Sequence, residues 1–164
     1  MLTLTLYDGN EAEMLPLIVG FWLAHNGEHQ TAEESRADLQ AWTGPGHRLY
    51  AIRQDGAPVG LVHLGSRGGE IDWLEDLFVL PEFQNRGIGT WAVHAAEELV
   101  KAYSPSMYLE AAARNEAAIR LYRRLGYDCL NTVTLRRDFP GYDYEVVRTE
   151  SLYGAPFEIR RSRN

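Results

Sequence analysis

The sequence predicts a single α/β domain with a mixed sheet. Short segments in which apolar and polar residues alternate are typical of strands, and other segments have apolar residues at the three- and four-residue spacing of helices. No repeat, linker or low-complexity tract separates them. At 164 residues, 45% hydrophobic and 24% charged, the chain has the size and composition of one domain with a sizeable core. We therefore expect residues 1–164 to form one domain.

The first quarter of the chain predicts one strand and two helices. Leu2–Tyr7 alternates as a strand does, and the apolar run that follows predicts a helix ending near Asn26–Gly27. Thr31 and Glu34 have the Ser/Thr-x-x-Glu spacing of a capping box. This pattern predicts a second helix that begins there and reaches about Trp42.

The middle of the chain predicts a hairpin, a long strand and a helix. Arg48–Gly65 contains two alternating segments joined by an Asp55–Gly56 turn, and Glu70–Leu80 reads as a third strand that ends before a proline. The helical spacing begins at about Gln84 and stops at Ser104–Pro105.

The last third predicts a short strand, a helix, a strand and a hairpin. Met107–Ala112 reads as the short strand, and Asn115 can cap a helix that Gly126 ends. Tyr127–Phe139 reads as the next strand, and the tail reads as a hairpin turning near Gly154. An edge strand in this hairpin can pair with another copy of the chain, so a homodimer is one expectation.

The charge and apolar content of the chain indicate which classes of binding partner it can have. Lys and Arg number 16 against 23 Asp and Glu, a net charge of −7 that favours cationic partners over nucleic acid. No segment reaches the roughly 18 apolar residues that a membrane span requires, and the first residues do not resemble a leader peptide. We expect a cytoplasmic protein without a membrane partner. Cys129 is the only cysteine, and we expect it to be buried.

One histidine pair fits a zinc motif by its letters alone. His25–His29 reads H-x-x-E-H, but ligands in that motif need a continuous helix, and Asn26–Gly27 interrupts it. We therefore expect no bound metal.

The segment Gln84–Thr90 carries the strongest functional signal. Its two glycines, Gly87 and Gly89, stand at the entrance of the predicted helix, where backbone amides can reach an anion if no side chain blocks the approach. A dinucleotide fingerprint with Glu110 on the ribose is one interpretation, although that motif should follow its strand directly. A nucleoside-triphosphate loop is disfavoured because Gly-Lys-Ser/Thr is missing. A third interpretation is a pyrophosphate held by convergent amides.

Two motifs together resemble those of the GNAT superfamily of acyl-CoA-dependent N-acyltransferases. Gln84–Gly89 matches its Gln/Arg-x-x-Gly-x-Gly/Ala signature, and Asn115–Tyr127 matches its second motif in the same order and at a similar separation. The resemblance implies a mixed, mostly antiparallel central sheet flanked by about four helices. It also implies acetyl-CoA as the co-substrate.

The resemblance implies where acetyl-CoA binds. The amides of Gln84–Thr90 would hold the pyrophosphate, Asn115 the pantetheine arm, and the backbone N–H of Val79 the thioester carbonyl. The implied cofactor-binding residues are Leu77, Phe78, Val79, Gln84, Asn85, Arg86, Gly87, Ile88, Gly89, Thr90, Asn115 and Tyr122.

The same resemblance implies two catalytic residues. An alkyl amine with a pKa of about 10.4 is mostly protonated at neutral pH, so a base must remove a proton before attack. Glu75 is the candidate base, because on a regular strand it shares a face with Leu77 and Val79 while Asp76 points to the opposite face. Tyr122 occupies the position of the family's general acid.

The sequence indicates only the chemical class of the amine acceptor. The "LEDLFV" context and the net charge favour a primary amine of a small cationic compound. The alternatives are a protein N-terminus or lysine, and a non-catalytic module that binds acyl-CoA.

Overall fold

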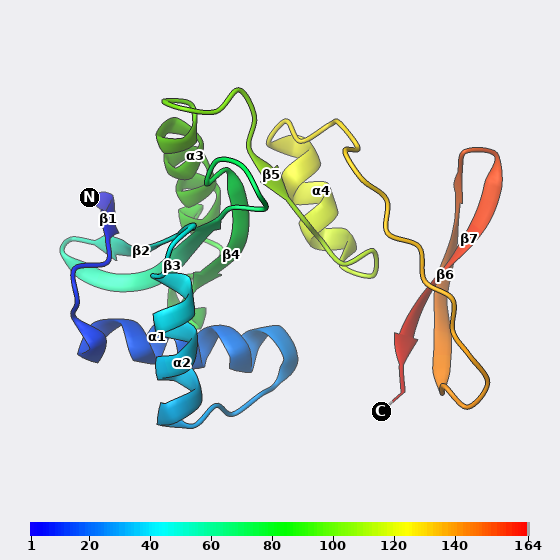
Figure 1. Cartoon of the computed structure of the whole chain (residues 1–164), viewed down its shortest axis with the longest axis horizontal. Coiled ribbons are helices and arrows are strands. Elements are labelled where there is room, and N and C mark those ends of the chain that lie inside the picture. The colour runs from blue at the N-terminus through cyan, green and yellow to red at the C-terminus, as the bar shows by residue number, and fades with distance from the viewer. Residues whose placement is uncertain (164) are drawn as a thin grey trace. The chain divides into compact units, whose positions relative to one another are not determined.

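The computed structural model describes residues 1–163, and the chain forms two compact units, Met1–Glu110 and the described part of Ala111–Asn164. Figure 1 shows the elements of both. The first unit contains β1 (Leu2–Leu6), α1 (Glu11–Asn26), α2 (Ala32–Trp42), β2 (His47–Gln54), β3 (Ala57–Gly65), β4 (Trp73–Val79), a 3₁₀ turn (Pro81–Phe83), α3 (Ile88–Val100) and β5 (Tyr108–Leu109). The second contains α4 (Glu116–Arg124), β6 (Tyr144–Leu152) and β7 (Ala155–Ser162).

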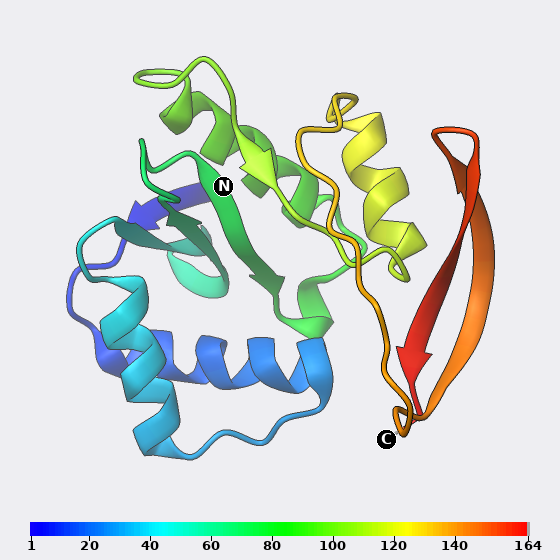
Figure 2. The ribbon, with the colours of Figure 1, turned by 45° about the vertical axis from the view of Figure 1, so that its right-hand side comes forward.

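The first unit is built on a five-stranded sheet in the order β1-β2-β3-β4-β5. Every neighbouring pair is antiparallel except β4 and β5, which run parallel. Helices α1 and α2 lie on one side of this sheet and α3 on the other (Figure 2). The predicted mixed, mostly antiparallel sheet and four helices are thus confirmed. No helix within residues 1–163 has the length and apolar character needed to cross a membrane.

The core between α1 and the sheet is apolar and closely packed. Its largest members come from α1, α2 and strands β2 to β4: Met14, Leu17, Ile18, Phe21, Leu39, Trp42, Leu49, Leu61 and Phe78. A Cβ at Gly20 would lie 2.9 Å from the ring of Phe78, so the glycine lets this ring pack directly against α1. The ring also meets Phe21 edge-on. This contact fixes one end of β4 against α1.

Local sequence signals are placed as expected. Gly27 is left-handed (φ 76°) and ends α1, and Thr31 and Glu34 form both bonds of the capping box that begins α2. Asp55 and Gly56 both have positive φ, as the two-residue turn between β2 and β3 requires.

The strand predicted over Tyr127–Phe139 is wrong. These residues form no helix or strand, and side chains such as Leu130 and Phe139 are about 70% exposed. Alternation alone does not make a strand, because its backbone groups also need a partner. In the described part of the second unit, β6 pairs instead with β7 across the turn at Gly154. Cys129, expected to be buried, is exposed.

Two predicted boundaries also differ. The strand predicted over Glu70–Leu80 is shorter, and the helix expected from about Gln84 begins only at Ile88. The reason is Gly87, whose φ of 78° is left-handed and cannot continue into a helix on its N-terminal side.

Replacing Gly60 by alanine should separate β3 from β4. A Cβ at Gly60 would lie 2.2 Å from the carbonyl oxygen of Phe78. We expect the free energy of unfolding to fall by about 2–4 kcal/mol. Chemical denaturation measures this, with Gly69→Ala as the control, because a Cβ at Gly69 meets nothing within 4 Å. Equal losses in the two variants would contradict the close approach.

Candidate active site

One edge of β4 has free backbone groups near its end. The N–H of Leu80 donates to the Val59 carbonyl, and Val79 lies opposite Gly60 in the antiparallel register with β3. Bonding alternates along such a ladder, so the N–H and C=O of Val79 point away from β3. On that side β5 pairs with β4 only at Trp73 and Leu74. The Val79 N–H is therefore placed to donate to a ligand.

The backbone N–H groups of the other two predicted residues of β4, Leu77 and Phe78, point to opposite edges of the strand. Leu77 lies opposite Val62 and has the same ladder phase as Val79, so its N–H also points to the free edge. Phe78 lies opposite Leu61, its N–H points toward β3, and its ring belongs to the core. Leu77 and Val79 thus offer backbone donors at the free edge, and Phe78 anchors the strand.

The loop after β4 is tied to this edge. The side-chain amide of Gln84 donates to the Val79 carbonyl at 2.8 Å. Asn85 (φ 59°) and Gly87 (φ 78°) are both left-handed, so the chain turns sharply at both positions before α3 begins. The loop therefore carries its donors close to the end of β4.

The N-terminus of α3 has the properties of an anion site. Within residues 1–163 the N–H groups of Ile88, Gly89 and Thr90 bond to no protein acceptor, as is usual for a first helical turn. That turn carries no acidic side chain, and a Cβ at Gly89 would meet nothing within 4 Å. The exposed side chain of Arg86 adds a positive charge. The residues present thus fit a pyrophosphate, which the helix dipole also favours.

Glu75 lies on a β-bulge. Asp76 is paired with His63 and Leu74 with Leu64, so Glu75 has no partner on β3. A Cβ at Gly65 would lie 2.8 Å from Cγ of Glu75, so this side chain lies over Gly65. The alternation that groups Glu75 with Leu77 and Val79 therefore does not hold across the bulge. Bulges redirect side chains in this way and are frequent near active sites.

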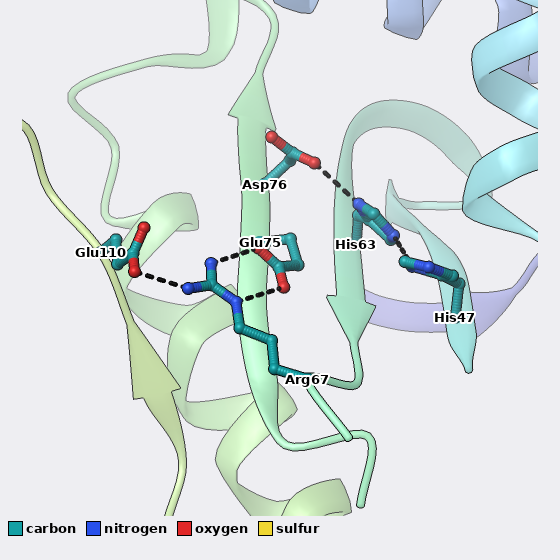
Figure 3. A network of polar contacts seen from close by, with 6 residues as sticks. All are labelled: His47, His63, Arg67, Glu75, Asp76 and Glu110. Atoms are coloured by element: carbon teal, nitrogen blue, oxygen red, sulfur yellow. Dashed lines mark hydrogen bonds and ion pairs between the residues drawn. The ribbon is translucent and has the colours of Figure 1, made fainter. Parts of the chain in front are cut away.

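Both carboxylate oxygens of Glu75 are bound by Arg67 (Figure 3). Nε of Arg67 donates to Oε1 at 3.1 Å and Nη2 donates to Oε2 at 2.9 Å, while Nη1 donates to Glu110. The two carboxylates raise the pKa of Arg67 further above its ordinary value. The sequence patterns do not predict these contacts, because the bulge and the turn before β4 bring the three residues together.

Asp76 belongs to a separate network. Its Oδ2 lies 2.7 Å from Nδ1 of His63, and Nε2 of His63 lies 2.9 Å from Nδ1 of His47 (Figure 3). His63 is only 3% exposed, and its ring stacks on Trp42. This network joins β2, β3, β4 and α2.

Asn115 and Tyr122 lie in the second unit. The side chain of Asn115 accepts a hydrogen bond from the Ala118 N–H at 3.1 Å, which confirms it as the cap of α4. Tyr122 is on α4, and its ring meets Tyr127 edge-on. Burial raises the pKa of the Tyr122 hydroxyl above 10. The hydroxyl therefore keeps its proton at neutral pH.

Removing the imidazole of His63 should destabilise the first unit. His63→Ala deletes a stacked ring and leaves Asp76 and His47 without this partner, so we expect a loss of about 2–4 kcal/mol in unfolding free energy. His94→Ala is the control, because His94 is on the exposed side of α3 and its contact is an ion pair with Glu97. Equal effects of the two substitutions on thermal unfolding would show that the buried network contributes nothing.

Comparison with known proteins identifies the family of this chain. The model of the Acetyltransferase (GNAT) family matches residues 13–127. Mycothiol acetyltransferase of Mycobacterium sp. (strain JLS) is 29% identical over 113 residues, which are 65% of this chain and 38% of that protein. The [ribosomal protein bS18]-alanine N-acetyltransferase of Salmonella typhimurium is 39% identical over 67 residues, 40% of this chain and 43% of that protein. Each match thus spans less than half of the curated relative.

A solved structure shares the fold. It is the AAC(6')-Iy enzyme in complex with a bisubstrate analogue, CoA-S-monomethyl-acetylneamine, and it superposes with a TM-score of 0.66 at 17% identity. The superposition covers 85% of this chain and 99% of that one. The family model matches more than half of the chain, from α1 through the glycine loop to the end of the Asn115 motif. The chain belongs to the GNAT family of acetyltransferases.

Proposed function

We propose that this chain is an N-acetyltransferase that moves the acetyl group of acetyl-CoA directly to a primary amine of a small cationic compound. The observation that carries the proposal is the position of free N–H groups on two sides of one short loop. Val79 precedes the loop on the unpaired edge of β4, and Ile88, Gly89 and Thr90 follow it at the start of α3. A thioester carbonyl and a pyrophosphate both need such donors.

Acetyl-CoA supplies an activated acetyl thioester. The α3 amides hold its pyrophosphate, with the side chain of Asn115 as a further contact to the pantetheine arm. The Val79 N–H donates to the carbonyl oxygen as negative charge develops on it, an interaction that contributes about 3–4 kcal/mol in comparable sites. These groups bind and polarise the donor without forming a covalent bond to the protein.

Glu75 and Tyr122 carry out the proton transfers of the reaction. Glu75 accepts a proton from the acceptor ammonium, so that the nitrogen lone pair can attack the thioester carbonyl. The C–N bond forms as the C–S bond breaks, and Tyr122 donates its proton to the departing thiolate. The nitrogen of the new amide then loses its second proton to the Tyr122 phenolate, and Glu75 releases the first proton to solvent, so both side chains return to their starting states. Arg67 binds both oxygens of Glu75, so at least one of these contacts must open before Glu75 can act.

A protein N-terminus is the second candidate acceptor. The observation in its favour is the 39% identity over 67 residues to a ribosomal-protein-alanine acetyltransferase. The first candidate, a small cationic amine, is supported by the net charge of −7 and by Glu75 and Glu110 side by side around Arg67. An acetyl-transfer assay with polyamines, aminoglycosides and an Ala-initiated peptide separates the two. Release of CoA with the peptide alone would favour the protein acceptor.

Blocking the loop should abolish binding of acetyl-CoA. Gly89→Trp places a large side chain at the first turn of α3, beside its free amides, and the Cβ that it adds meets nothing within 4 Å. In calorimetric titrations we expect the wild type and the control Gly69→Trp to bind acetyl-CoA, and Gly89→Trp not to bind it. NAD is titrated in parallel. Binding of NAD alone, or of neither ligand, would contradict the proposal.

Removing the Tyr122 hydroxyl should slow turnover and leave binding intact. We expect Tyr122→Phe to lower kcat by about 100-fold or more, with the dissociation constant of acetyl-CoA unchanged. Because its pKa is raised, the hydroxyl is protonated at lower pH and loses its proton only as the pH rises past 10. A decline in wild-type kcat that Tyr122→Phe abolishes should therefore lie above pH 10. Equal kcat in both proteins would remove Tyr122 from the mechanism.

A further inference from the structure

We propose that Trp73, Glu75 and Glu110 form a binding site for a cationic group of the acceptor, and that Arg67 occupies it until the acceptor displaces it. These three residues are called the cation site below. The inference rests on the proposed function, because the ligand it names is the acceptor of that reaction. It adds the place where the acceptor binds and an internal group that competes with it.

The guanidinium of Arg67 is held as a bound organic cation would be. Glu75 accepts two parallel hydrogen bonds from it, and Glu110 accepts a third. Its Cζ lies 3.7 Å from the centroid of the Trp73 ring, in cation–π contact. Paired carboxylates and an aromatic face are what proteins use to recognise ammonium and guanidinium groups. The cation site is thus shaped for such a group and holds one that belongs to this chain.

The walls of the cation site belong to the sheet. Trp73 and Glu75 are on β4, and Trp73 stacks on Tyr108 of β5 at 5.1 Å between ring centroids. Glu110 directly follows β5. Gly65 on β3 leaves the space that the Glu75 side chain fills. These residues therefore stay in place when the occupant changes.

Arg67, which fills the cation site, belongs to the loop between β3 and β4. Arg67 is followed by Gly68 and Gly69, and a Cβ at either glycine would meet nothing within 4 Å. The loop is fixed on both sides of this stretch: Ser66 donates to the Gly46 carbonyl, and the Ile71 carbonyl accepts from Tyr103. The Ser66 hydroxyl also donates to the Gly69 carbonyl at 2.7 Å, which closes the turn around Arg67 and Gly68. Arg67 therefore leaves the cation site by rotation about its own side-chain bonds, while the loop and the sheet keep their hydrogen bonds.

An incoming cation can reach the contacts that it must replace. The side chain of Arg67 is 37% exposed and that of Glu110 is 60% exposed, so the guanidinium is open to solvent on one side. A cation brought by the acceptor can replace these bonds one for one. When the incoming cation is the reacting ammonium, the exchange replaces Arg67, which keeps its proton, by a group whose proton Glu75 can accept.

Direct binding of a cation in the absence of acetyl-CoA tests the inference. The probes are N-propylguanidinium and N-propylurea, which have nearly the same shape but differ in charge. The variants are Arg67→Gln, which vacates the cation site, and Arg36→Gln as a control, which removes the same charge from an exposed position on α2. Calorimetry gives the affinity, and the indole N–H signal of Trp73 in NMR spectra reports where the probe binds.

We expect Arg67→Gln to bind N-propylguanidinium at least tenfold more tightly than the wild type or Arg36→Gln, with a shift of the Trp73 signal. Adding Glu75→Gln to Arg67→Gln should remove the gain, and N-propylurea should not bind to any variant. Equal affinity in all three proteins, or equal binding of the urea, would overturn the inference.

Arg67→Lys keeps the proposal testable if Arg67→Gln does not fold. A lysine makes fewer bonds to the two carboxylates, so we expect the guanidinium probe to bind Arg67→Lys more tightly than the wild type. No gain would contradict the inference. Failure here is distinguishable from failure of the proposed function: acetyl transfer without any cation binding refutes only the cation site, and cation binding without acetyl-CoA binding refutes only the acetyltransferase.

Discussion

The candidate site depends on the unequal pairing of the two edges of β4. Along one edge the strand pairs with β3 as far as Val79, and the Leu80 N–H donates to the Val59 carbonyl just beyond it. Along the other edge β5 pairs with it only at Trp73 and Leu74. Backbone N–H groups need an acceptor, and those that the sheet leaves free are available to a ligand. Gln84 satisfies the Val79 carbonyl and connects this edge to the loop that begins α3. One strand thereby brings the Val79 N–H, which can donate to a carbonyl oxygen, close to the free amides at the start of α3.

The bulge at Glu75 determines where the two neighbouring carboxylates of β4 point. On a regular strand, the side chains of Glu75 and Asp76 would point to opposite faces. Because Glu75 is an extra residue in the pairing with β3, its side chain contacts Arg67 while that of Asp76 contacts His63. Asp76 is held by buried His63 and contributes to the fold. Glu75 is bound by Arg67 from a glycine-containing loop, and we propose that a cation of the acceptor exchanges with Arg67. In the proposed mechanism, adjacent carboxylates thus have different roles: Asp76 stabilises the fold and Glu75 accepts a proton.

Features set by near neighbours in the chain could be predicted from the sequence, and features set by distant ones could not. The capping box at Thr31, the Asn115 cap and the glycine loop each depend on residues within a few positions. The strand expected over Tyr127–Phe139 failed because pairing depends on a partner that alternation does not specify. The Arg67 contacts escaped prediction for the same reason, because they arise from the bulge register.

The central claim is that the edge of β4 and the start of α3 bind acetyl-CoA together. The most direct test is a titration of ¹⁵N-labelled protein with acetyl-CoA, in which each backbone amide is observed by NMR. The largest shifts are expected at Ile88, Gly89 and Thr90, with a further shift at Val79. Shifts confined to other residues, or none at saturating acetyl-CoA, would contradict the claim.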